Sequence, residues 1–231
     1  MKFRVERQEL TEALADVSRV ATARTSAMPA LAGVELAVSG ETLTLSCTDK
    51  EISIQSTLSV GGQKDGVAVP SARVLTDLVR GLPDGKVQIA LEAESLVVEA
   101  ARNRSSVMCY SAVDFPKIIQ ASAAEGTVSA SLFGEALRQV VRAASADLSR
   151  LALTGVLISN QAEGLTFVAT DSYRLAVRQI AGTSLAGEST VIIPARALGE
   201  LLRLIKDHET ITYRLAADRA TFSVGNTTLS T

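Results

Sequence analysis

An internal repeat relates the two halves of this chain and limits the folds that it can adopt. Residues 31–34 match residues 153–156, and residues 43–49 match residues 165–171, both at an offset of 122 residues. Further matches lie 123 or 124 residues apart, as small loop insertions would produce: residues 12–14 with 135–137, Pro70 with Pro194, Arg73 with Arg196, and Arg80 with Arg203. A repeat of this length indicates two copies of one domain.

The apolar pattern of each copy predicts the same order of elements: a strand, a helix, several strands, a second helix and further strands. Helices are predicted at residues 8–20, 71–81, 132–145 and 195–205, because apolar residues recur there at helical spacing. Residues 112–126 have no period and contain Pro, Ser and Gly, which is typical of a connection between domains. The prediction is therefore an α+β fold with antiparallel sheets, in two domains at residues 1–120 and 121–231.

The clearest local pattern is a strand, a turn and a strand at residues 165–178. Alternating side chains flank Asp171 and Ser172, whose short polar groups can bond their own backbone in a turn. A weaker copy lies at residues 43–54, where Asp49 is equivalent to Asp171. A paired-carboxylate role for the two aspartates stays open, but turn chemistry is the favoured interpretation.

Composition narrows the function classes. The 231 residues carry a formal net charge of −2, which argues against a wholly basic nucleic-acid binder but allows one basic surface. No apolar run reaches the length of a membrane span, and the N-terminus does not resemble a signal peptide. An enzyme with a site between the domains is an alternative, but the single His208 has no nucleophile partner, and metal-ligand clusters and phosphate-binding glycine loops are absent from the sequence.

Arginines recur on the polar faces of the predicted helices. Arg138 and Arg142 are four residues apart, and two further pairs seven residues apart are equivalent in the repeat: Arg73 with Arg80, and Arg196 with Arg203. Such rows can neutralise phosphates without reading bases. The alternative is an ordinary solvated face, and the acidic Glu9, Glu12 and Asp16 on the first helix count against a basic surface there.

Several segments, in order over the whole chain, resemble the bacterial DNA sliding clamp, the beta subunit of DNA polymerase III. They are residues 1–7, 24–33, 68–70, 80–83, 114–116 and above all 169–177 (ATDSYRLAV). The resemblance implies the DNA-clamp fold, in which repeated domains place antiparallel sheets outside and two helices each toward a central hole. Family members have three domains per chain, and two chains close a ring around duplex DNA.

The resemblance also implies a function and partners. It implies a non-catalytic processivity factor, an accessory subunit of the DNA polymerase holoenzyme in the cytoplasm, with no cofactor and no metal. It implies sequence-independent contact with double-stranded DNA, and tethering of the polymerase, the clamp loader and repair proteins through a short peptide motif. The expected DNA-binding residues are Arg24, Arg73, Arg80, Arg138, Arg142, Arg150, Arg196 and Arg203.

The turn after the strand at residues 165–170 matches the family's peptide-binding pocket. The expected wall consists of Leu153, Thr170, Ser172, Tyr173, Arg174 and Leu175. The alternative is a plain hairpin turn. A two-domain scaffold that binds peptides or ligands and has no DNA role is the other function class that we consider.

The departure from the family pattern is at the C-terminus. Thr231 is the repeat equivalent of Val107, and the family pattern continues beyond it into a third domain. We therefore expect a truncated form in which the final strand of the central domain is incomplete and the third domain is absent. Such a chain is expected to fold as two domains without closing the two-chain ring, and a ring of three two-domain chains stays an alternative.

Overall fold

The computed structural model describes residues 1–22, 28–181, 188–205 and 208–231. The chain forms two compact units, Met1–Ile118 and Ile119–Thr231. Among the described residues, no helix is both long enough and apolar enough to cross a membrane.

The first unit is a curved antiparallel sheet with two helices. Its strands lie in the order β4-β3-β2-β6-β9-β8-β7-β1-β5. Their bounds are β1 Lys2–Glu6, β2 Glu35–Ser39, β3 Thr42–Thr48, β4 Ser53–Ser59, β5 Gly61–Lys64, β6 Gly66–Pro70, β7 Lys86–Glu92, β8 Ser95–Ala100 and β9 Asn103–Tyr110. The helices are α1 Arg7–Val17 and α2 Ala72–Arg80, and short 3₁₀ turns lie at Ser18–Val20 and Pro29–Ala32.

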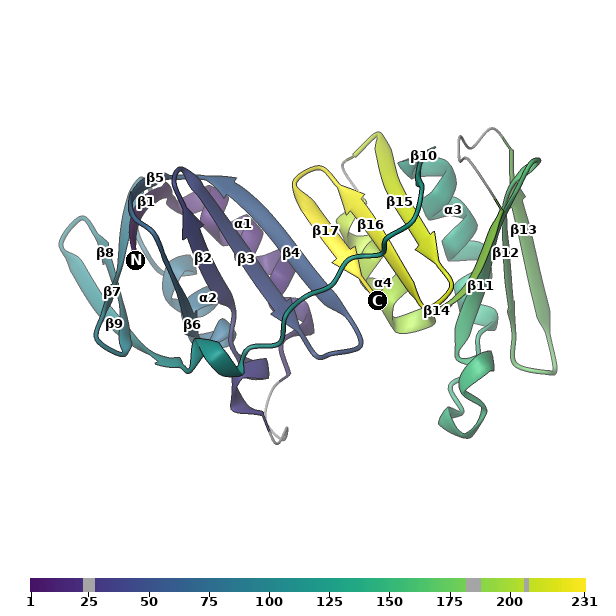
Figure 1. The fold of residues 1–231 in the computed structure, drawn as a ribbon, viewed down its shortest axis with the longest axis horizontal. Coiled ribbons are helices and arrows are strands. Elements are labelled where there is room, and N and C mark those ends of the chain that lie inside the picture. Colours follow the sequence, from purple (N-terminus) through teal and green to yellow (C-terminus); the bar gives the residue numbers. More distant parts are fainter. Residues whose placement is uncertain (23–27, 182–187, 206–207) are drawn as a thin grey trace. The chain divides into compact units, whose positions relative to one another are not determined.

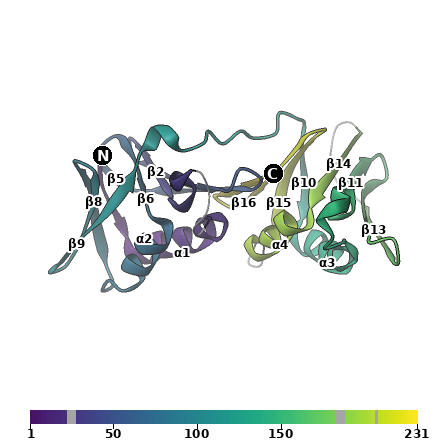
Figure 2. The same ribbon diagram turned by 90° about the horizontal axis from the view of Figure 1, so that it is seen from below.

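Both helices of the first unit cover one face of the sheet. Helix α1 packs on β3, β4 and α2 through Leu10, Ala13, Leu14 and Val17, all of which are buried. These four residues recur at helical spacing, so the apolar period that predicts a helix in this segment is confirmed. Figure 2 shows α1 and α2 on one side of the strands, while the segment after β9 crosses the opposite side. The first unit therefore has a helix face and an outer sheet face.

The second unit consists of two antiparallel sheets with two helices between them. One sheet has the order β13-β12-β11-β14, and the other contains β10-β15-β16-β17. The strand bounds are β10 Glu125–Ser129, β11 Gly155–Gln161, β12 Gly164–Thr170, β13 Leu175–Ile180, β14 Ser189–Pro194, β15 Thr210–Ala216, β16 Arg219–Val224 and β17 Thr227–Ser230. The helices are α3 Ala130–Val140 and α4 Ala195–Leu204, with 3₁₀ turns η4 Val141–Ala143 and η5 Leu148–Leu153 (Figure 1).

An aromatic cluster joins the layers of the second unit. The ring of Phe133 on α3 packs edge-on against Phe167 of β12 at 5.2 Å between centroids, and lies 5.7 Å from Phe222 of β16. All three side chains are buried. Phe133 therefore touches both sheets, and the apolar area that it removes from water stabilises their packing.

The two units repeat one pattern of strand pairing. In the first unit Glu35 pairs with Ser46, and Ser46 pairs with Gln55. In the second unit Leu157 pairs with Val168, and Val168 pairs with Val177. Each residue of the second row lies 122 positions after its counterpart. The predicted α+β fold with antiparallel sheets is confirmed. The structure adds that the repeat extends to the pairing register of three strands.

Three elements differ from the prediction. The helix predicted at residues 8–20 is an α-helix only to Val17, and Ser18–Val20 forms a 3₁₀ turn. The helix predicted at residues 132–145 begins at Ala130 and ends at Val140, and Arg142 lies in the following 3₁₀ turn η4 instead of on the same α-helix as Arg138. Strand β5 is not predicted by the sequence, because Gly-Gly-Gln-Lys has no alternating apolar residues. It forms through backbone pairing with β1 at the edge of the sheet.

The segment between β9 and β10, residues 111–124, is called the connector below. It begins with a 3₁₀ turn at Ala112–Asp114, and Phe115 is then buried in the first unit. Within the second unit, the backbone N–H of Ala121 donates to the hydroxyl of Thr221 at 2.8 Å. The connector is therefore fixed at both of its ends, one in each unit.

Phe133→Ala tests the role assigned to the aromatic cluster. We expect this substitution to destabilise the second unit by about 3–5 kcal/mol, because it leaves a cavity between two sheets. The matched control is Leu132→Ala at the adjacent, exposed position, which should change stability far less. Urea unfolding followed by NMR reports each unit separately, and equal destabilisation by the two variants would contradict the assignment.

Candidate functional site

The turn at residues 170–175, called the outer turn below, is held by a dense set of local hydrogen bonds. The hydroxyl of Thr170 donates to the carbonyl of Arg174 at 2.7 Å. One carboxylate oxygen of Asp171 accepts from the backbone N–H groups of Tyr173 and Arg174, each at 3.0 Å. The Nε of Arg174 donates to the other oxygen at 3.0 Å, and Ser172 has a φ of 79°. The predicted turn chemistry of Asp171 is confirmed.

The first unit contains the same turn built from equivalent residues. The hydroxyl of Thr48 donates to the carbonyl of Ile52, and one oxygen of Asp49 accepts from the N–H groups of Glu51 and Ile52. Lys50 has the same φ of 79° as Ser172. The backbone scaffold is therefore common to both units, and only the side chains that it displays differ.

The outer turn displays apolar side chains that its counterpart lacks. Tyr173 is 95% exposed and Leu175 is 65% exposed, whereas the equivalent residues of the first unit are the polar Glu51 and Ser53. Leu153, the other apolar residue of the expected wall, is half-buried at the end of the η5 turn. Exposed large apolar groups that are gathered on one turn are typical of a surface that binds a partner.

Arg150 connects the η5 turn to the outer turn. Its Nη1 donates to the hydroxyl of Ser172 at 2.9 Å, and its Nε donates to Asp147 at 3.3 Å. The family resemblance groups Arg150 with the DNA-binding residues, but the structure places it against the outer turn. No sequence pattern predicts this contact, because residues 150 and 172 are distant in the chain and lie in different elements.

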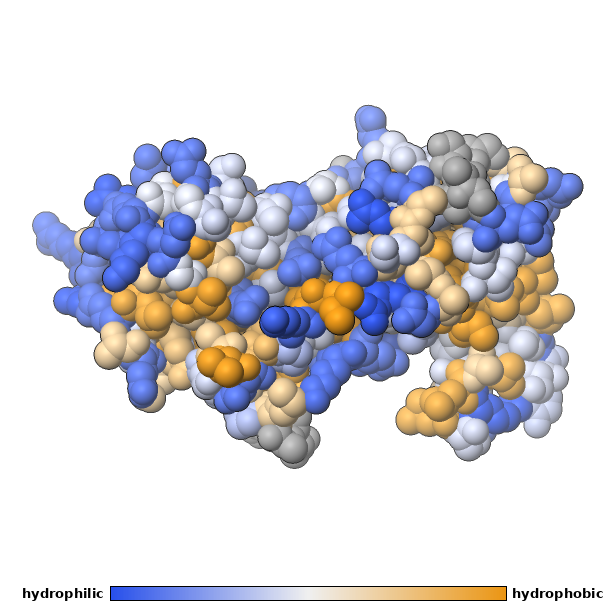
Figure 3. Space-filling model, in the orientation of Figure 1, coloured by the Kyte–Doolittle hydropathy of each residue, from blue (hydrophilic) through white to orange (hydrophobic). Residues whose placement is uncertain are grey.

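Exposed leucines surround Arg150 on the η5 turn. Leu148 is 76% exposed and Leu151 is 72% exposed. Figure 3 shows these apolar colours on the segment that projects below β11 in Figure 1. Together with Tyr173 and Leu175, they extend the apolar surface beyond the residues that sequence reasoning identifies.

Hydrogen bonding lowers the pKa of two carboxyl groups near this surface. The backbone N–H of Arg174 and then that of Tyr173 hold the pKa of Asp171 below its usual range, and the nearby Arg174 guanidinium adds to the effect. The hydroxyl and backbone N–H of Ser149 do the same for the pKa of Asp147. Both groups are therefore acceptors that shape turns, and neither is poised to exchange a proton near neutral pH.

The helix faces carry the second group of predicted residues. On α2, Arg73 and Arg80 are exposed on either side of Asp77, at 3.9 and 3.8 Å from its carboxylate. On α4, Arg196 and Arg203 are exposed, and Arg203 forms an ion pair with Glu200 at 3.0 Å. Such solvated pairs hold their arginines only weakly, so the guanidinium groups stay available for phosphates.

Arg138 and Arg142 are the most available cations of this group. Both are exposed, and neither forms an ion pair with any residue that the structure describes. Arg24 lies outside the described residues. The structure thus presents basic side chains on α2, on α3 with the following η4 turn, and on α4.

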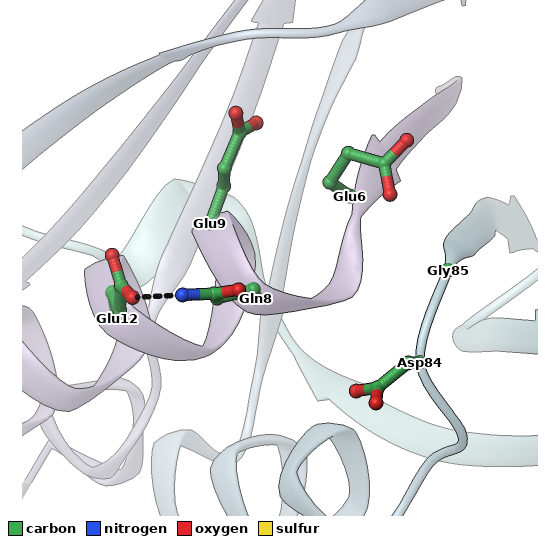
Figure 4. Close-up of a pocket in the computed structure, with 6 residues that line it drawn as sticks. All are labelled: Glu6, Gln8, Glu9, Glu12, Asp84 and Gly85. Atoms are coloured by element: carbon green, nitrogen blue, oxygen red, sulfur yellow. Dashed lines mark hydrogen bonds between the residues drawn. The ribbon is translucent and has the colours of Figure 1, made fainter.

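An acidic hollow of about 440 Å³ interrupts the basic character of the first unit. It is lined by Glu6, Gln8, Glu9, Glu12, Asp84 and Gly85 (Figure 4). Gln8 donates to Glu12 at 3.0 Å, and Arg7 pairs with Asp84. No cluster of potential metal ligands occurs among the described residues. Helix α1 is therefore a poor surface for phosphates, as its sequence indicates.

Comparisons with known proteins place both halves of the chain in one family. Residues 1–119 match the family model described as DNA polymerase III beta subunit, N-terminal domain, and residues 127–231 match the one described as its central domain. The beta sliding clamp of Micrococcus luteus is 31% identical over 205 residues, which is 88% of this chain and 66% of that protein.

Solved clamp structures match the whole of this chain. A DNA polymerase sliding clamp from Bacillus subtilis superposes with a TM-score of 0.94 and 25% identity. A sliding clamp from Pseudomonas aeruginosa, solved bound to griselimycin, gives 0.93 and 26%. Each comparison covers 100% of this chain and 64% of the other, so the chain spans about two thirds of the length of these relatives.

The lowered pKa of Asp171 gives a prediction about pH. Because the folded pKa lies below the unfolded value, the carboxylate stabilises the outer turn at neutral pH, and this contribution disappears only as the pH falls through the lowered folded pKa. We expect the carboxyl carbon of Asp171 to titrate by NMR below the ordinary aspartate value of about 3.9. A midpoint at or above that value would contradict the hydrogen-bond geometry.

Proposed function

This chain belongs to the DNA polymerase III beta subunit family, and we propose that it acts as a sliding-clamp processivity factor in the cytoplasm. In this role the chain forms part of a ring around duplex DNA and tethers the replicative polymerase, the clamp loader and repair proteins. The ring is formed by two copies of the full-length protein. The chain itself catalyses no reaction. A ring replaces tight binding to DNA by a topological linkage, so weak contacts with DNA suffice.

The observation that carries the DNA role is the recurrence of arginines on helix faces at repeat-equivalent positions. Arg73 and Arg80 of α2 correspond to Arg196 and Arg203 of α4, and all four are exposed. Exposed guanidinium groups neutralise phosphates without reading base edges, so contact with DNA is independent of sequence. Such contacts are weak individually and allow a ring to slide.

The outer turn supplies the site for protein partners in this proposal. Tyr173 and Leu175 offer apolar surface. The guanidinium groups of Arg174 and of Arg150, which is held by its hydrogen bond to Ser172, add N–H donors at the edge of this surface. This combination suits an extended peptide with an apolar anchor. A sliding clamp from Pseudomonas aeruginosa was solved bound to griselimycin. We expect griselimycin to bind this chain at the outer turn.

The salt dependence of DNA binding tests the basic helix faces. We expect Arg138→Ala with Arg196→Ala to reduce the slope of log K against log salt by about 0.9 for each phosphate that the variant no longer neutralises. Fluorescence anisotropy with a labelled duplex at low salt measures this slope. Arg102→Ala, at an exposed arginine in the β8–β9 turn, is the matched control and should leave the slope unchanged.

Reversing the charge of the helix faces tests whether they contact DNA when the protein acts as a ring. Substituting Arg73, Arg80, Arg196 and Arg203 by Glu in the full-length protein should abolish clamp loading and processive synthesis. If both activities survive this reversal of charge, the helix faces do not contact DNA and a scaffold without a DNA role becomes the better explanation.

Substitutions in the outer turn test the docking role. We expect Tyr173→Ser with Leu175→Ala to weaken griselimycin binding about tenfold, because less apolar surface is buried. A tenfold change corresponds to a loss of roughly 1.4 kcal/mol of binding free energy. Glu51→Ala, at the equivalent of Tyr173 in the first unit, is the control. Isothermal titration calorimetry that gave equal affinities for both variants would place the compound elsewhere.

A further inference from the structure

A second hollow, of about 540 Å³, lies on the outer sheet face of the first unit. Its floor includes Glu35 of β2 and Gln55 of β4, and the connector forms its walls through Val113, Phe115, Pro116 and Lys117. Phe115 is buried and fixes the connector to the sheet, whereas Val113 is 94% exposed beside the opening. Figure 2 shows the connector on the side of the sheet opposite α1 and α2, so a ligand here does not compete with the helix face of this unit.

The floor of this hollow is a polar row across three strands. Glu35 pairs with Ser46, and Ser46 pairs with Gln55, so the three side chains lie side by side on one face. Gln55 donates through Nε2 to the hydroxyl of Ser46 at 3.2 Å, and Ser46 is buried. On the outer face of the sheet, Ser46 is thus shielded from solvent, whereas Glu35 lines the hollow.

The carboxylate of Glu35 has an unsatisfied charge. Its side chain is half-buried, and it forms no hydrogen bond or ion pair with any residue that the structure describes. Burial raises the pKa of this carboxyl group, because no cation offsets the loss of solvent. A half-buried charge without a partner favours a ligand that supplies one.

The second unit shows that the polar row is a departure from the common scaffold. Its equivalent row consists of Leu157, Val168 and Val177, which pair in the same register. The second unit therefore presents three aliphatic side chains where the first presents a carboxylate, a hydroxyl and an amide. The two copies share one backbone register but differ in the chemistry that this row displays.

We propose that this hollow is a second peptide-docking site, which binds an extended segment carrying one lysine or arginine next to an apolar residue. The cation contacts Glu35, and the apolar residue packs on Val113 and Pro116 of the connector. Lys117 on the wall disfavours a run of several basic residues. This site is separate from the outer turn and does not depend on the clamp function proposed above.

Peptide titrations of the 231-residue chain followed by NMR test this site. The probe is acetyl-Ala-Arg-Leu-Ala-amide, and its neutral match carries citrulline in place of arginine. We expect saturable amide shifts at Glu35, Gln55, Val113 and Lys117, in the millimolar range, with the citrulline peptide binding about fivefold more weakly. Shifts confined to other regions, or equal affinity for the two peptides, would overturn the proposal.

Three variants separate charge recognition from general effects. Glu35→Gln should remove the preference for arginine over citrulline, whereas Glu41→Gln, at an exposed carboxylate in the β2–β3 turn, should keep it. Val113→Ser should weaken both peptides equally and leave the preference intact. An unchanged preference in Glu35→Gln overturns the proposal, and so does ethylguanidinium binding as tightly as the arginine peptide, because the hollow would then be only a cation site.

Discussion

The structure depends on a pair of equivalent turns that fix the register of the strands. Thr48 with Asp49, and Thr170 with Asp171, bond the same backbone groups in the two units. Because side chains alternate along a strand, a slip of one residue would move every core residue to solvent. The turns therefore determine which side chains lie on the side of the helices and which lie on the opposite side. The proposed DNA contacts and the proposed protein contacts both depend on this division of the side chains.

On this shared scaffold, function differs with the side chains that each copy displays. The outer turn presents Tyr173 and Leu175, while its counterpart presents Glu51 and buries Ile52. On the sheet next to these turns, an aliphatic row in the second unit replaces the row headed by Glu35. Duplication has thus kept the interactions that stabilise the fold and changed the ones that meet partners.

Much of this architecture could be predicted from sequence, because the repeat and the apolar periods are local signals. The apolar stripe of α1, from Leu10 to Val17, and the turn at Asp171 are examples. The missed features depend on tertiary contacts: β5 forms through pairing with β1, Arg150 reaches Ser172 across 22 residues, and Glu35 becomes half-buried only under the connector. Hydrophobic patterns do not encode such contacts.

In these proposals the helix faces meet DNA, whereas the outer turn and the outer sheet face of the first unit meet proteins. Paramagnetic relaxation enhancement from a spin-labelled duplex tests this division most directly, since it detects weak and transient proximity. We expect line broadening at Arg73, Arg138 and Arg196, and sharp signals at Glu35 and Tyr173. Broadening at the outer turn with sharp signals on α2, α3 and α4 would contradict this division.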